Sequence, residues 1–186
     1  MRAIDVANFY IKLGKAVDNA EVTNARVNKL LYFAQGWYLA LKGTPLFDDD
    51  FEAWQYGPVI PSIYRTFSIC GSNIIPNTTV DDESDKNITK EDEEFLINVF
   101  SYYLDHSTNK LISLTHDIDT PFSQVYVRGM NSVITKKSMK KYFSDKFRMS
   151  AFINSINKTK KVGYINNDGY TVLPKEYYYR EEDELY

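Results

Sequence analysis

The sequence holds few of the residues that most catalytic or metal-binding sites use. It has one cysteine, Cys70, and two histidines, His106 and His116, in 186 residues. A single cysteine cannot form an internal disulfide, and this set cannot supply the three or four ligands of a typical zinc site. The eight glycines match neither the dinucleotide-binding nor the Walker spacing, and no G-x-S-x-G motif occurs. We therefore expect no metal, no cofactor, no catalytic residues and no enzymatic activity.

Long apolar runs and a large net charge are also missing. No stretch approaches the ~20 apolar residues of a membrane span, and the first residues lack the apolar core of a secretory signal. The net charge of −3 argues against direct binding to nucleic acid. With 44% hydrophobic residues, the composition is that of a globular protein. These features predict a cytoplasmic protein with no membrane contact.

Apolar residues recur at three- and four-residue steps in several segments, which indicates helices with one buried face. Pro61 suits a first turn, and Gly43 suits the position just past a helix end. The residues that suit helix caps are Asn24 or Thr23, Thr89, Ser107 or Thr108, and Thr135. The predicted helices cover about residues 4–15, 24 or 25 to 42, 61–69, 90–105, 108 or 109 to 116, and 136–143.

β-Structure is expected in two places. Residues 51–56 read as a short strand, and residues 162–165 and 170–173 flank an Asp-Gly turn that is typical of a hairpin. Residues 146–156 could form one more helix. We predict a mainly α (α+β) fold, with a single compact helical domain over residues 1–145. Residues 146–186 form a carboxy-terminal extension with the β-hairpin and an acidic, tyrosine-rich tail.

The most informative part of the chain is residues 28–64, where polar residues occupy positions that core packing does not require. On the expected helix, Leu31 belongs to the apolar stripe, whereas Tyr32 and Gln35 lie along a neighbouring face. In the strand that follows, Trp54 and Tyr56 alternate and so point to the same side. Polar or amphipathic residues in such places can lie on a solvated flank, pack in the core, or belong to a binding surface.

The block contains the motifs NKLLYFAQ at residues 28–35 and EAWQYGPVIP at 52–61 with Tyr64, and LTH at 114–116 and TPF at 120–122 follow it. These motifs resemble those of the SocA-like, or Panacea, domain family, which includes phage-associated GepA-like proteins. The resemblance extends over about residues 4–144, although a Trp is more usual where Phe122 stands. It implies a mainly helical domain of toxin–antitoxin pairs and prophages, which neutralises a toxin or presents it for proteolysis.

The resemblance and the residue pattern together predict an antitoxin-type protein that binds a cognate toxin directly or delivers it to a protease. Aromatic side chains with polar tips bury much area for little lost rotamer freedom, which suits interface hot spots. The expected partner-binding residues are Tyr32, Gln35, Trp54, Tyr56, Tyr64, His116, Tyr177 and Tyr178. The oligomeric state does not follow from the sequence.

Two other functions remain open. Acidic clusters at residues 48–50, 81–85, 91–94 and 181–184 could mimic nucleic acid, as in a prophage-encoded anti-defence inhibitor that binds a host effector. Such clusters are more often solvated faces. His116 lies near Ser113, Thr115 and Asp117, which are residue types of a hydrolase site. A histidine at a helix end more often hydrogen-bonds a carbonyl or carboxylate.

Overall fold

The computed structural model describes residues 1–17, 20–80, 87–145, 164–165 and 171–172 of the chain. The helices in this part are α1 (Ala3–Ala16), α2 (Asn24–Lys42), α3 (Pro61–Thr66), α4 (Lys90–Tyr103), α5 (Thr108–His116) and α6 (Lys136–Asp145). Single 3-10 turns occupy Ser68–Cys70 and Asn77–Thr79. The strands are β1 (Phe51–Trp54), β2 (Gly57–Val59), β3 (Val133–Ile134), β4 (Tyr164–Ile165) and β5 (Thr171–Val172). The fold is mainly α with a small β component, as predicted.

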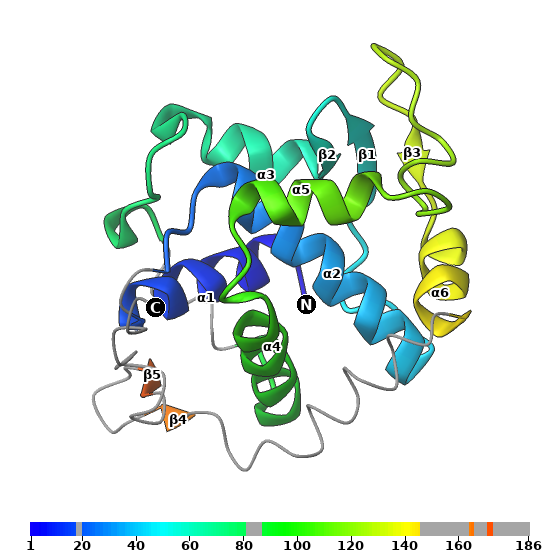
Figure 1. Cartoon of the computed structure of the whole chain (residues 1–186). Coiled ribbons are helices and arrows are strands. Elements are labelled where there is room, and N and C mark those ends of the chain that lie inside the picture. The colour runs from blue at the N-terminus through cyan, green and yellow to red at the C-terminus, as the bar shows by residue number, and fades with distance from the viewer. Residues whose placement is uncertain (18–19, 81–86, 146–163, 166–170, 173–186) are drawn as a thin grey trace, which may run out of the picture.

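Helix α2 is the centre of the arrangement. It contacts α1, α3, α4, α5, α6 and β2, so most of its residues are buried (Figure 1). Gly36 lets α6 approach closely, because a Cβ at this position would lie 2.2 Å from the ring of Phe143. The Phe143 ring in turn packs edge-on against Trp37, with 5.0 Å between ring centroids. The main core therefore forms around α2, within the predicted helical domain.

The helix ends carry the caps that the sequence indicates. The Thr23 hydroxyl accepts a hydrogen bond from Arg26 N, and Thr89, Ser107 and Thr135 each accept one from the backbone amide three residues on. Gly43 ends α2 in the left-handed conformation, with φ 77°, and its amide donates to Leu39 O. Helix α3 ends earlier than expected, at Thr66, and the chain continues as the 3-10 turn Ser68–Cys70.

Strand β1 pairs antiparallel with β2 on one side and β3 on the other, in the order β2-β1-β3. The sequence predicted only the first of these strands. Gly57 starts β2 with φ 96°, and a Cβ there would lie 2.7 Å from both Lys29 Cε and Thr115 Oγ1. A glycine is therefore required by backbone conformation and by space. It sets the tight β1–β2 turn directly against α2 and α5.

The remaining predictions concern the extension. Strands β4 and β5 pair antiparallel, with Tyr164 opposite Val172, which confirms the predicted hairpin. The helix expected over residues 146–156 and the tail with Tyr177 and Tyr178 lie outside the described residues. None of the described helices combines the length and apolarity needed to cross a membrane.

Candidate protein-binding surface

The polar side chains of α2 point into the molecule and bind main-chain groups of its neighbours. Arg26 is 5% exposed, and its guanidinium donates to the carbonyl oxygens of Tyr103, Leu104 and His106 at 2.6–3.0 Å. These carbonyls lie at the carboxy-terminal end of α4, where helix oxygens lack intrahelical donors and a positive charge is stabilising. Arg26 thus caps α4 from the central helix.

Two further residues of α2 hold the segment that follows β1. The Asn28 side-chain oxygen accepts from Ile60 N at 3.0 Å, just before α3 begins. The Lys29 ammonium is buried and donates to Pro58 O in β2 at 2.9 Å. Burial lowers the pKa of Lys29 to about 7, because the charged form loses hydration that one carbonyl does not replace. These contacts fix β2 and α3 to α2.

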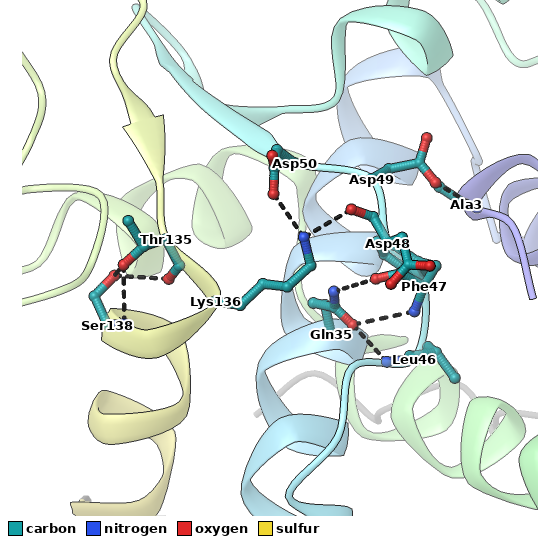
Figure 2. A network of polar contacts seen from close by, with 10 residues as sticks. All are labelled: Ala3, Gln35, Leu46, Phe47, Asp48, Asp49, Asp50, Thr135, Lys136 and Ser138. Atoms are coloured by element: carbon teal, nitrogen blue, oxygen red, sulfur yellow. Dashed lines mark hydrogen bonds and ion pairs between the residues drawn. The ribbon is translucent and has the colours of Figure 1, made fainter.

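Gln35 performs the same function for the segment after α2. Its side-chain oxygen accepts from Leu46 N at 2.8 Å, and its amide nitrogen donates to Phe47 O at 2.7 Å (Figure 2). Gln35 is fully buried. A single side chain therefore satisfies two main-chain groups that have lost contact with water.

The acidic residues that follow are also used within the fold. Asp49 accepts a hydrogen bond from Ala3 N at 3.1 Å, at the start of α1. Lys136, at the start of α6, donates to Asp48 O at 2.7 Å and to the Asp50 carboxylate at 2.6 Å (Figure 2). The cluster at residues 48–50 thus connects the segment after α2 to α1 and α6, which weakens its interpretation as a nucleic-acid mimic.

Tyr32 and Gln35 do not lie on a surface, so their expected placement is corrected. Tyr32 is 1% exposed and Gln35 is 0% exposed. The prediction treated α2 as a helix with one buried stripe, whereas most of the α2 residues are buried. A face beside the apolar stripe is then also buried. On that face Gln35 satisfies main-chain groups, whereas the Tyr32 hydroxyl has no hydrogen-bond partner among the described residues.

The other described members of the predicted set reach the surface around the β1–β2 turn. Tyr56, at the turn itself, is 67% exposed, and Tyr64 on α3 is 41% exposed. Trp54 is half-buried and packs tilted against Tyr64, with 5.0 Å between ring centroids. His116 is exposed at the end of α5, and its Nε2 lies 3.4 Å from Gln55 O in the same turn. We call Trp54, Tyr56, Tyr64 and His116 the hairpin-tip patch, because they lie around the turn of the hairpin formed by β1 and β2.

His116 is held by the protein backbone. Its Nδ1 lies 2.8 Å from Ile112 O, and its ring packs on buried Phe122 at 4.4 Å between centroids. Among the described residues, no carboxylate hydrogen-bonds to His116. Its contact with Ile112 O is that of a histidine at a helix end that bonds a backbone carbonyl. This was the interpretation of His116 that the sequence offered besides a hydrolase site. Within the same described ranges, no group of three or more His, Cys, Asp or Glu residues could hold a metal ion.

Sequence reasoning missed two features of this region. Arg26 and Lys29 are charged residues within an apolar helical pattern, and that pattern was the available signal for a buried role.

The segment after His116 exposes large apolar side chains at Ile118, Val127, Met130 and Val133, which are 50–84% exposed. These residues have no periodicity, so nothing in the sequence marked them as a surface. Among them, Val133 in β3 lies opposite Glu52 of β1.

Comparison with known proteins adds an independent finding. The model of the antitoxin SocA-like, Panacea domain family matches residues 27–120. Antitoxin SocA of Caulobacter vibrioides (strain NA1000 / CB15N) is 44% identical over 75 residues, which are 40% of this chain and 39% of that protein. The chain thus matches well under half of this relative's length. No solved structure matches. The residues matched by the family model include the whole hairpin-tip patch and most of α2.

The role of Gln35 can be tested by stability. We expect Gln35→Ala to lower the free energy of unfolding by roughly 2–4 kcal/mol, because it leaves two buried main-chain groups without partners. Gln55→Ala is the matched control: Gln55 is exposed in the β1–β2 turn, and its loss should cost less than about 0.5 kcal/mol. Urea denaturation measures both. Equal stabilities of the two variants would contradict the structural role.

The buried amine of Lys29 predicts a pH dependence. Because its pKa is lowered to about 7 in the folded chain, the unfolded chain binds more protons above pH 7, and stability rises with pH. Between about pH 7 and 9.5 the free energy of unfolding should increase by about 2–3 kcal/mol more in the wild type than in Lys29→Met. Lys15→Met, at an exposed position, should keep the wild-type slope. Parallel pH profiles for wild type and Lys29→Met would refute this assignment.

Proposed function

Because the chain belongs to the antitoxin SocA-like, Panacea domain family, we propose that it is an antitoxin that binds and neutralises a cognate protein toxin. Direct contact with the toxin is needed both for simple inhibition and for delivery to a protease. Both modes of action therefore require a surface of this chain that binds the toxin. We propose that this surface is the hairpin-tip patch.

The observation that carries this proposal is an exposed aromatic residue on a rigid turn. Tyr56 is 67% exposed, yet the turn beneath it is fixed by the Lys29 contact to Pro58 O and by the close fit of Gly57 against α2 and α5. A large side chain presented from a fixed frame loses little conformational entropy on binding. Trp54 and Tyr64 add adjoining aromatic area, and amphipathic rings of this kind are enriched in hot spots.

The acidic alternative is less well supported. An anti-defence inhibitor that mimics nucleic acid needs free carboxylates, whereas Asp49 and Asp50 hydrogen-bond to Ala3 N and Lys136. The clusters at residues 81–85 and 181–184 lie outside the described residues. Binding through the hairpin-tip patch should be weakly salt-dependent, and binding through acidic clusters should weaken strongly as salt rises.

We also propose the division of the chain into a helical domain, residues 1–145, and an extension, residues 146–186. Helix α6 packs on α2 through Phe143, so residues up to Asp145 contribute to the central core. The extension would then add partner specificity, with Tyr177 and Tyr178 as its proposed contact residues.

The contact surface predicts a separation of binding from stability. Tyr56→Ala and Trp54→Ala should each weaken binding of the cognate toxin by at least about 1 kcal/mol. The change in unfolding free energy should stay below about 1 kcal/mol for Tyr56→Ala, because its side chain is exposed. Ile69→Ala is the control, since Ile69 is an exposed apolar residue, 90% exposed, beyond α3. Calorimetric titration with the protein encoded by the adjacent gene, and rescue of growth in its presence, measure these effects.

Undiminished toxin binding by both Tyr56→Ala and Trp54→Ala would place the interface elsewhere. Loss of binding in Ile69→Ala as well would indicate that the effect is not specific to the patch.

The proposed extension can be removed as a unit. Deleting residues 162–186 should leave the thermal unfolding of the helical domain nearly unchanged, because the main core lies upstream. Binding of the toxin should be lost or strongly reduced. The full-length variant with Tyr177→Ala and Tyr178→Ala tests whether these two residues account for the loss. Full binding and neutralisation by the truncated protein would contradict a role of the extension in specificity.

A further inference from the structure

A cavity of about 270 Å³ lies between α2, α4, α5 and α6 and shares no residue with the hairpin-tip patch. Its walls are mainly aromatic. Phe33 and Tyr103 form a stacked pair with 4.4 Å between ring centroids, and Phe143 packs edge-on against Trp37. A volume of this size is near the lower end for small-molecule sites. The volume and the aromatic lining suit a small, planar, apolar body.

Two residues that line the cavity each carry a buried polar atom with no hydrogen-bond partner among the described residues. Tyr32 lines the cavity and is 1% exposed, yet its hydroxyl makes no hydrogen bond. His106 also lines the cavity, and its Nδ1 is likewise buried and unpartnered. Buried polar atoms without partners are costly and infrequent in folded proteins. A ligand that reached these two atoms would supply the missing partners.

The charged side chains around the cavity indicate which kind of ligand the cavity can bind. Lys110 lines it from α5, and none of the described lining residues is acidic. Burial, together with the charges of Lys110 and Arg26, lowers the pKa of His106, so its imidazole is neutral at neutral pH and can accept a hydrogen bond. The site thus combines aromatic walls, a neutral acceptor, a hydroxyl and a cation.

We propose that this cavity binds a small aromatic carboxylate of roughly ten to fourteen non-hydrogen atoms. The aromatic body packs against Phe33, Tyr103 and Phe143. The Tyr32 hydroxyl and His106 hydrogen-bond to the polar groups of the ligand, and Lys110 offsets its negative charge. This site is separate from the surface proposed for the toxin, so each can fail without the other.

Indole-3-acetate is a suitable probe, because it joins a planar ring and an N–H donor to a carboxylate. The full chain is titrated with indole-3-acetate, and binding is monitored by calorimetry and by the NMR signals of the cavity residues. We expect saturable binding with a Kd between about 10 μM and 1 mM. Tyr32→Phe should weaken binding at least about fivefold. The melting temperature of free Tyr32→Phe should be unchanged or higher, because an unpartnered buried hydroxyl is removed.

Tyr10→Phe is the matched control. The Tyr10 hydroxyl is also buried and unpartnered, but Tyr10 does not line the cavity, so this variant should keep the wild-type affinity. Lys110→Gln changes an exposed residue and should weaken indole-3-acetate several-fold while leaving neutral 3-methylindole unaffected. Absence of saturable binding would overturn the proposal. So would binding that Tyr32→Phe and Lys110→Gln leave unchanged, or that Tyr10→Phe weakens equally.

Discussion

The structure depends on buried polar side chains of one helix that bind the main chain of its neighbours. Arg26 holds the end of α4, Asn28 and Lys29 hold β2 and the start of α3, and Gln35 holds the segment after α2. Each contact replaces water at a main-chain group that burial would otherwise leave unpaired. Apolar packing alone would bring these elements together without fixing their positions. The polar contacts specify where each element lies against α2.

The proposed binding surface follows from that frame. The β1–β2 turn lies over Lys29 and Thr115, with no room for a side chain at Gly57. The turn therefore has one well-defined position, and Tyr56 projects from it. The same family motif thus contains two kinds of residue, those that bind main-chain groups inside and those that are presented outside. Near the surface, Asp49 and Asp50 add contacts from the segment after α2 to the start of α1 and to Lys136 of α6.

Most helices and their caps could be predicted from the sequence, because caps and periodicity are local signals. Gly43 and Thr89 are examples, and both act as expected. Tyr32 and Gln35 were misplaced because their burial depends on how many elements surround α2, which no local pattern records. Lys29 was missed although its place within an apolar helical pattern was an available signal for burial. Strands β2 and β3 have three and two residues, too short for a periodic signal. The exposed position of Tyr56 agrees with the surface placement expected for it.

Amide hydrogen exchange of the free chain and of its complex with the toxin separates the internal contacts of α2 from the exposed β1–β2 turn. The amides of Leu46 and Ile60, which donate to Gln35 and Asn28, should exchange in the free chain only through global unfolding. The amide of Tyr56, at the exposed turn, should exchange quickly in the free chain and slow down in the complex. Rapid exchange of Leu46 and Ile60 in the free chain, or protection of these two only when the toxin is bound, would contradict the account.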